Sequence, residues 1–202
     1  MQELLEVRWH GRGGQGAKTA AQILAECAMD SGAYIQAFPE YGPERAGAPM
    51  QAFTRIADEP IKLHSGIKAP DIVVVLDPTL LGSVDVANGL KDAGLLLVNS
   101  SEEPEKLREQ CNCESGEVAA VDATGIALDT IDLPMPNIPL LGALVKLREI
   151  ITLEELKKGV QKKMEKKIGT EKTEGNIRGI EEAYQGVRIW RKEDGETSPS
   201  GE

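Results

Sequence analysis

The spacing of apolar and polar residues at the start of the chain predicts a strand, a glycine-rich loop, a helix and a second strand. Residues 4–9 alternate loosely between apolar and polar, as strands do. Residues 17–29 are rich in Ala, Ile and Leu, which favour a helix, and Gly32 stands where a helix commonly ends. Residues 33–38 have the pattern of a second strand. This order of elements is typical of an α/β domain.

Apolar runs further along the chain predict more strands, one of them central in the sheet. The continuous β-branched run at 71–77 is typical of a strand that is buried on both faces. Other strands are expected at 51–56, 60–63, 94–98 and 118–121. The first two of these are expected to form a β-hairpin whose turn lies near Asp58 and Glu59.

Helical patterns separate these strands and dominate the C-terminal part of the chain. Helices are expected at 79–91, 102–110, 140–150, 153–168 and 175–190. Thr152 and Glu155 form a capping box at the start of the fourth of these helices. The stretches 39–50 and 132–139 each contain three prolines and are expected to be irregular.

Taken together, these elements predict an α/β fold with a Rossmann-like open sheet, a glycine-rich first strand-to-helix loop and a β-hairpin insertion. The length of 202 residues, 41% of them hydrophobic, suits a single folded domain, which we place at residues 1–190. Residues 191–202 contain no apolar residue, so we expect them to form a disordered acidic tail.

The charge and the cysteine content narrow the class of protein. A net charge of −10 argues against dedicated nucleic-acid binding, which goes with a basic excess. No apolar run approaches the ~18 residues of a membrane span. Three cysteines are too few for a disulfide framework. The N-terminus has no signal-peptide pattern, so we expect a cytoplasmic protein.

The glycine-rich loop is the first candidate site. Residues 11–16 match the pattern G-x-G-x-x-G, directly after a predicted strand and before a predicted helix. Glycines let the backbone approach a ligand closely, and a helix N-terminus offers unpaired N–H groups to an anion. The candidate anion-binding residues are Gly11, Arg12, Gly13, Gly14, Gln15, Gly16 and Lys18.

The pattern leaves three interpretations of this loop open. A dinucleotide site needs an acidic residue about 20 residues further on, and Glu40, the candidate, lies in the proline-rich stretch. A nucleoside-triphosphate site needs a lysine directly after the last glycine, but Ala17 precedes Lys18. In the third interpretation, the glycines allow a tight turn that packs against a neighbouring loop or subunit.

The proline-rich stretch 39–50 is a second candidate, as a docking loop. Tyr41, Glu44 and Arg45 lie in it, and Glu44 with Arg45 can also be a solvated charge pair of little energetic weight. Four of the seven aromatic residues fall within 34–53. Because aromatic residues and Arg are enriched at interfaces, this clustering favours docking.

Other chemistry has less support in the sequence. Cys111 and Cys113 are one residue apart and Cys27 is distant, whereas metal and iron–sulfur sites use four ligands at wider spacings. We therefore expect no metal on this chain. His10 and His64 are the only histidines, and no G-x-S-x-G motif accompanies them. His10 can face the glycine loop, although a packed or solvated histidine is the commoner case.

Several motifs in the same order give the chain a resemblance to a known family. They are Trp9–Gly16, Phe38–Arg45 with Gly47–Pro49, Asp77–Leu81, and Pro136-Asn137 followed by Leu140–Leu144. The chain resembles the gamma subunit of 2-oxoacid:ferredoxin oxidoreductases over roughly residues 3–187. The stretch Glu44–Pro49 is similar to the pyruvate and 2-ketoisovalerate branch, with Ala46 in place of a frequent arginine.

The resemblance implies a subunit of a complex that converts a 2-oxoacid and coenzyme A to acyl-CoA, CO₂ and reduced ferredoxin. It implies that thiamine diphosphate and Mg²⁺ are held by alpha and beta subunits, and [4Fe-4S] clusters by a ferredoxin-like delta subunit and the beta subunit. The gamma chain would itself carry no cofactor and have a structural, capping role. Its glycine loop would lie at subunit contacts near the coenzyme A path, with Tyr41, Glu44 and Arg45 at an interface. External ferredoxin would be a further partner.

Two other classes of function stay open from the residues alone. One is a free-standing dehydrogenase that binds a dinucleotide at the glycine loop. The other is an interaction module whose glycine loop binds no small molecule.

Overall fold

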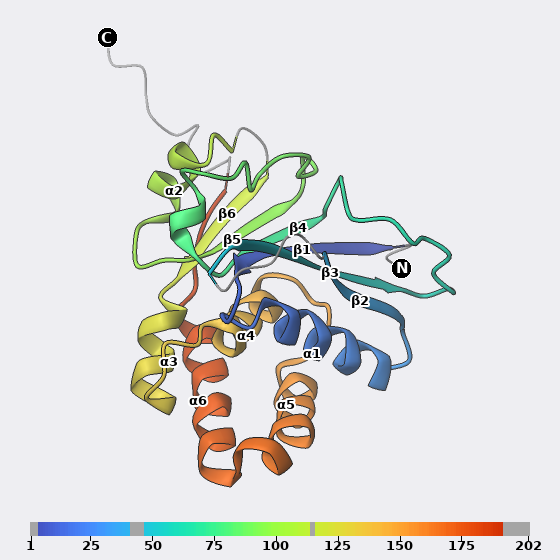
Figure 1. The fold of residues 1–202 in the computed structure, drawn as a ribbon, viewed down its shortest axis with the longest axis vertical. Coiled ribbons are helices and arrows are strands. Elements are labelled where there is room, and N and C mark those ends of the chain that lie inside the picture. Colours follow the sequence, from blue (N-terminus) through green and yellow to red (C-terminus); the bar gives the residue numbers. More distant parts are fainter. Residues whose placement is uncertain (1–3, 41–46, 114–115, 192–202) are drawn as a thin grey trace.

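The computed structural model describes residues 4–40, 47–113 and 116–191. In this part of the chain a mixed sheet has seven strands in the order β2-β3-β1-β4-β5-β6-β7 (Figure 1). The strands are β1 (Leu5–Arg12), β2 (Tyr34–Glu40), β3 (Pro49–Ala57), β4 (Ile72–Val75), β5 (Leu95–Asn99), β6 (Glu117–Val121) and β7 (Arg188–Trp190). Strands β1, β4, β5 and β6 are parallel, and β3 and β7 are antiparallel to their neighbours. The prediction of an α/β fold with an open sheet is confirmed.

Helices cover both faces of the sheet, but most of them pack against the same face. They are α1 (Ala17–Asp30), α2 (Pro104–Gln110), α3 (Ala123–Ile131), α4 (Asn137–Leu147), α5 (Leu153–Ile168), α6 (Thr170–Gly186) and a 3₁₀ turn, η1 (Pro78–Leu80). Buried side chains of α1, α3, α4, α5 and α6 form one core with the sheet, on the side below it in Figure 1. Residues of η1, α2 and the segment between η1 and β5 form a second, smaller core on the opposite face.

The central strand β4 divides these two cores. Ile72 and Val74 pack in the larger core, whereas Val73 and Val75 pack in the smaller one. Successive side chains of a strand point to opposite faces. Because both faces are covered here, all four side chains are buried. The expected strand buried on both faces is therefore confirmed, at 72–75 within the predicted 71–77.

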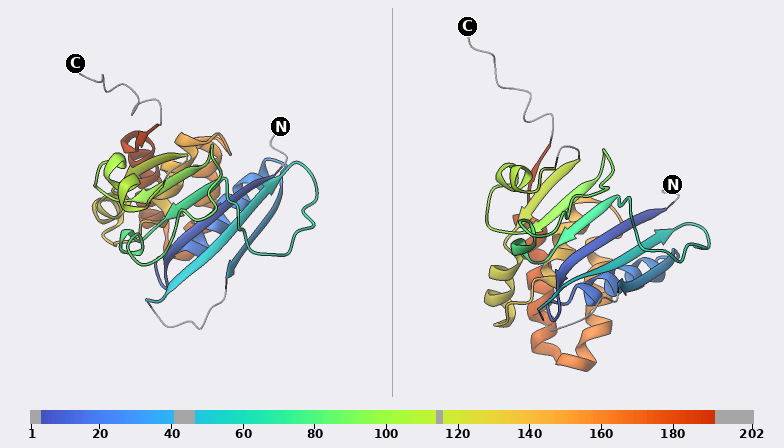
Figure 2. Two further views of the ribbon diagram at one scale, coloured as in Figure 1. Left: turned by 90° about the horizontal axis from the view of Figure 1, so that it is seen from above. Right: turned by 45° about the horizontal axis from the view of Figure 1, so that its top comes forward.

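The predicted hairpin of 51–56 and 60–63 is wrong. Residues 60–63 contain no strand, and the segment between β3 and β4 loops out beside the sheet (Figure 2). Strand β3 instead pairs with β1 on one edge and with β2 on the other, so that Ile56 lies between Leu5 and Ile35. With both edges of β3 occupied, no edge is left for a hairpin partner.

The predicted helix at 79–91 is also wrong, since η1 is followed there only by turns. Gly89 has a positive φ of 73°. A Cβ at this residue would overlap the carbonyl oxygen of Lys68. The carbonyl oxygens of Val86 and Asn88 turn toward the sheet and accept hydrogen bonds from the Arg8 guanidinium, at 3.0 and 2.6 Å. In a continuous helix the carbonyl of Val86 would instead accept from the N–H four residues further on.

Smaller differences concern helix ends and omitted elements. The helix expected at 140–150 begins at Asn137 and ends at Leu147, and the one expected at 175–190 is α6 followed by β7. Helix α3 had no counterpart in the prediction. The stretch 39–50 is not wholly irregular, because β2 runs to Glu40 and β3 begins at Pro49. Both prolines suit their places, at an edge strand and at a strand start.

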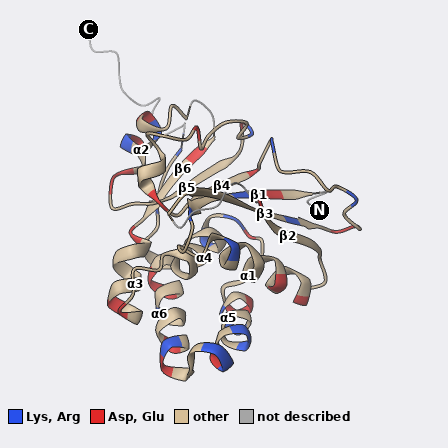
Figure 3. Cartoon of the chain, in the orientation of Figure 1, with Lys and Arg blue, Asp and Glu red and all other residues tan. Residues whose placement is uncertain are grey.

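Charge is distributed unevenly over this fold. Residues 101–132 hold nine acidic and two basic residues, whereas Lys and Arg gather where α5 meets α6 (Figure 3). This basic region lies at the end of the molecule farthest from the sheet in this view. Of the expected tail, only Arg191 belongs to the described residues.

We expect Gly142→Ala to destabilise the protein by up to about 2 kcal/mol. A Cβ at Gly142 would overlap the carbonyl oxygen of Ile180, because α4 and α6 cross at that point. Overpacking costs about 1–3 kcal/mol, against roughly 1 kcal/mol gained from the helix propensity of Ala. Urea unfolding followed by circular dichroism measures the change.

The matched control is Gly186→Ala, at the end of α6, where a Cβ would contact nothing within 4 Å. This variant should be as stable as the natural chain or slightly more so. Equal stability of both variants would show that the close crossing of α4 and α6 does not depend on a glycine.

Candidate functional site

The glycine loop and two other segments meet at the carboxyl end of β1 and β4. The loop connects β1 to α1, and residues 47–49 lie beside it because Arg12 pairs with Pro49 in the antiparallel register. The Gly13 N–H donates to the carbonyl of Ala48 at 3.2 Å. Residues 77–79 follow β4 and complete the group. Segments that are distant in sequence but carry the family motifs thus contact one another in space.

Arg12 joins these three segments with its whole guanidinium group. Its Nε donates to Asp77 Oδ2 at 3.0 Å, in an ion pair. Its two terminal nitrogens donate to the carbonyl of Gly47 at 3.1 Å and to the Thr79 hydroxyl at 3.0 Å. All three nitrogens are therefore used within the chain. Arg12, predicted as an anion ligand, serves here as a brace between the loops.

Asp77 is the acceptor at the centre of this arrangement. Besides Arg12, its carboxylate accepts from Gln15 Nε2 at 2.8 Å and from both the N–H and the hydroxyl of Thr79, at 2.9 and 2.6 Å. Burial alone would raise the pKa of Asp77, but the hydrogen bonds from Thr79 and Gln15, with the charge of Arg12, lower it below its ordinary value. Asp77 is therefore a fixed anion rather than an acid–base group.

Two of the glycines are required by the backbone of the turn. Gly14 and Gly16 have positive φ values of 99° and 83°, a region that side chains other than Gly rarely enter. A Cβ at Gly16 would also lie 2.5 Å from Nδ2 of Asn137, which is buried at the start of α4. Gly16 is the N-cap of α1 and receives no side-chain cap. The turn is thus packed tightly against α4.

The other predicted residues fall in different surroundings. Gly11 is buried, Gln15 also accepts from the Arg12 N–H at 2.7 Å, and Lys18 is exposed on the first turn of α1. In the described part of the chain, Lys18 forms no ion pair. Tyr41, Glu44 and Arg45 lie outside the described residues.

The dinucleotide interpretation loses support from the strand order. In that arrangement the acidic residue ends the strand next to β1. Here β3 lies between β1 and β2, so Glu40, at the end of β2, is one strand too far away.

Sequence reasoning did not single out Asp77, Thr79 and Asn137 as site residues, although their segments were part of the motifs. The signal was present for Asp77, because an Asp-Pro pair after a buried β-branched run predicts a strand end with a capping carboxylate. For Asn137, no local signal exists, since its contact with Gly16 spans 121 positions.

The cysteines are placed unfavourably for metal binding. Cys27, Cys111 and Cys113 are all buried. Burial raises the pKa of Cys27 and of Cys111 to about 11, with a smaller contribution from charged or polar neighbours. Because metals bind the thiolate, these thiols are poor ligands. In the described residues, no group of three or more His, Cys, Asp or Glu side chains is arranged to hold a metal ion.

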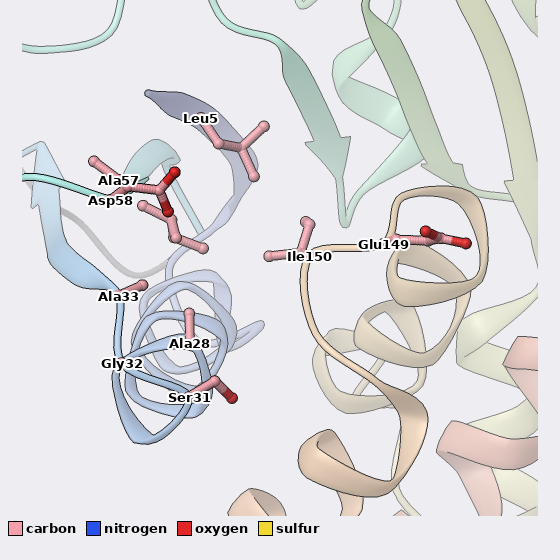
Figure 4. Close-up of a pocket in the computed structure, with 10 residues that line it drawn as sticks. Leu5, Ala28, Ser31, Gly32, Ala33, Ala57, Asp58, Glu149 and Ile150 are labelled. Carbon is pink, nitrogen blue, oxygen red and sulfur yellow. The ribbon is translucent and has the colours of Figure 1, made fainter. Parts of the chain in front are cut away.

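The largest hollow that we describe lies at the opposite end of β1. It has a volume of about 360 Å³. Figure 4 shows Leu5 of β1, residues at the ends of α1 and β3, and Ile150 from the segment between α4 and α5 around it. None of the predicted anion-binding residues lines it, so it is separate from the glycine loop.

Comparison with known proteins gives the class of the chain. The family model for pyruvate ferredoxin/flavodoxin oxidoreductase matches residues 6–186. The chain is 48% identical over 183 residues to pyruvate synthase subunit PorC of Thermotoga maritima, which covers 91% of this chain and 94% of that protein. The crystal structure of that subunit superposes with a TM-score of 0.84, at 43% identity over 94% of this chain and 100% of that one. The chain therefore belongs to the pyruvate ferredoxin/flavodoxin oxidoreductase family.

A further relative shows its place in this family, and a more distant structure shares its fold. The chain is 47% identical over 187 residues to the pyruvate/ketoisovalerate oxidoreductases common subunit gamma of Thermococcus kodakarensis, over 93% of this chain and 99% of that protein. The family type is thus the gamma subunit, as the resemblance predicted. The fold also recurs in the 2-oxoglutarate:ferredoxin oxidoreductase of Magnetococcus marinus, with a TM-score of 0.73 at 18% identity, over 92% of this chain and 31% of that one.

We expect Asp77→Asn to destabilise the chain by about 1–3 kcal/mol at pH 7. The substitution removes the ion pair with Arg12 and turns a donor toward the donors of Gln15 and Thr79. The folded state lowers the pKa of Asp77, so its stabilising effect is complete above the unfolded pKa of about 3.9. The difference between variant and natural chain should therefore shrink as the pH falls below about 3.9. Urea unfolding between pH 3 and pH 7 measures it.

Asp92→Asn is the control, because Asp92 is exposed and makes no ion pair in the part of the chain that the structure covers. A stability difference for Asp77→Asn that stays constant down to pH 3 would contradict the role of its charge.

Proposed function

We propose that this gamma-type chain is a structural, capping subunit of a complex that oxidises pyruvate or a similar 2-oxoacid with coenzyme A to acyl-CoA, CO₂ and reduced ferredoxin. The observation that carries the proposal is the closed network around Asp77. It holds the glycine loop, residues 47–49 and residues 77–79 together as one surface, and the guanidinium of Arg12 is engaged within the chain. A braced surface of this kind suits docking better than catalysis.

The proposal assigns the chemistry to other subunits. Thiamine diphosphate and Mg²⁺ belong to alpha and beta subunits, and [4Fe-4S] clusters to the delta and beta subunits, with external ferredoxin as electron acceptor. All three cysteines of this chain are buried, and the raised pKa values of Cys27 and Cys111 support that division. The Magnetococcus marinus enzyme, whose structure holds 2-oxoglutarate, coenzyme A and succinyl-CoA, supports coenzyme A as co-substrate of such complexes.

The docking surface is proposed at the glycine loop. Gly13 and Gly14 are exposed, and Lys18 offers a positive charge beside them. In this Rossmann-like turn the unpaired N–H groups at the start of α1 suit an acidic group of a neighbouring subunit or a phosphate of coenzyme A. Tyr41, Glu44 and Arg45 are proposed to extend this surface.

The proposal also covers the domain organisation and the location of the protein. The sheet runs without a break from β2 to β7, which supports a single domain over residues 1–190, with 191–202 as an acidic tail. No helix in the described ranges has the length and apolar character of a membrane span. The cytoplasm remains the proposed location.

We expect Gly13→Phe to weaken assembly at least about tenfold, because a bulky side chain at the centre of an interface removes its fit. Lys18→Glu should act in the same direction through its reversed charge. Native mass spectrometry of complexes formed with the alpha, beta and delta subunits measures the loss, and circular dichroism checks the fold of each variant.

Gly82→Phe is the matched control, since Gly82 is exposed and a Cβ there contacts nothing within 4 Å. Normal assembly of both Gly13→Phe and Lys18→Glu would refute the docking role. Tight binding of NAD(H) or NADP(H) to the isolated chain would instead support a dehydrogenase.

A further inference from the structure

A second hollow, of about 180 Å³, opens on the sheet face beside the glycine loop. Three polar side chains from three neighbouring strands border it: His10 of β1, Gln51 of β3 and Glu40 of β2. They lie in one row across the sheet, because Gln51 pairs with His10 on one side and with Glu40 on the other. The remaining walls are apolar and come from Pro49, Met50, Leu80 and Val84.

His10 has one nitrogen occupied and one that opens on the hollow. The Arg8 Nε–H donates to His10 Nε2 at 3.1 Å, so Nε2 carries no proton and Nδ1 carries it. Within the described residues, Nδ1 has no hydrogen-bond partner. In the described part of the chain, every side-chain nitrogen or oxygen that is fully buried has a hydrogen-bond partner. His10 is only 2% exposed and lines the hollow, so the hollow is the space that remains for a partner of its Nδ1–H donor.

The imidazole is neutral at pH 7. Burial and the nearby charge of Arg8 lower the pKa of His10 to about 3. The hollow therefore offers a neutral donor, polarised by the guanidinium behind it. At the rim, Glu40 and Gln51 provide acceptors, and neither side chain forms a hydrogen bond within the described chain.

From this arrangement we infer that the hollow is a binding site for an uncharged amide group on a small apolar body. The amide oxygen accepts from His10 Nδ1–H, and its N–H donates to Glu40 or Gln51. A carboxylate fits less well, because burying a charge beside one neutral donor and near Glu40 is costly. A cavity of about 150 Å³ holds a molecule of the size of benzene, so the volume suits an amide with a short alkyl chain. Both a partner subunit's peptide and a small molecule can supply this group.

The test uses the full chain labelled with ¹⁵N-histidine, since its two histidines give an assignable spectrum. N-propylacetamide is the probe, pentanoate is the anionic probe of equal size, and His64 is the internal reference. We expect N-propylacetamide to shift the Nδ1–H resonance of His10 with millimolar affinity, pentanoate to bind at least tenfold more weakly, and His64 to stay unchanged. An unmoved His10 resonance, or tighter binding of pentanoate, overturns the inference.

Substitutions in the hollow distinguish loss of the binding site from loss of the fold. His10→Phe should abolish the binding of N-propylacetamide, whereas His64→Phe should leave it unchanged. Because His10→Phe also leaves Arg8 Nε without its acceptor, Val84→Phe provides a second route, filling the hollow while the Arg8–His10 pair is kept. Unaltered binding to Val84→Phe overturns the location of the site.

A last arm identifies the source of the amide. In Val84→Cys, iodoacetamide labels the wall of the hollow, and N-propylacetamide should protect it in the free chain. Protection in the assembled complex without added probe assigns the amide to a partner subunit. Labelling that persists in the complex and is blocked by the probe assigns it to a small molecule. Absence of protection in every case overturns the inference, and because the free chain is tested first, this result is independent of the proposed subunit role.

Discussion

The carboxyl end of the sheet depends on one anion, the carboxylate of Asp77. Donors from the glycine loop and from η1 converge on it, and the Arg12 brace extends its hold to Gly47. Because the ordinary cost of burying a carboxylate is met by several hydrogen bonds, the group stays charged and the three segments stay together. The glycine loop is thus shaped from inside the chain, before any ligand or partner arrives.

Strand β3 has a comparable influence on function. Its insertion between β1 and β2 turns the opening strand–helix–strand unit into part of a mixed sheet. It moves Glu40 away from the position in which an acidic residue would hold a ribose. In exchange, it places Gln51 between His10 and Glu40, and so creates the polar row that borders the smaller hollow. The position of β3 thus argues against a dinucleotide site and makes the proposed amide site possible.

The sequence predicted the features that depend on local pattern. The buried run of β4, the capping box of α5 and the turn at the glycine loop follow from residue types within a few positions of one another. The failures have a long-range cause. The turns that replace the helix expected at 79–91 present two carbonyls to Arg8, which is far away in sequence. The hairpin failed because β3 finds both of its partners earlier in the chain. The contact of Arg12 with Asp77 was not predicted because the two residues are 65 positions apart.

Arg8 and Arg12 lie on the same face of β1 but have different hydrogen-bond partners. Arg12 meets a carboxylate, and its three nitrogens all donate within the chain, so the network holds three segments together. Arg8 forms no ion pair in the described residues and instead donates to carbonyls and to His10. A cation so placed fixes the imidazole tautomer and keeps the ring neutral, which leaves one polarised N–H unused. A donor that lies at the edge of a hollow, rather than sealed in the core, can meet a ligand. A fold that retains one beside an apolar hollow is therefore prepared for an acceptor from outside the chain.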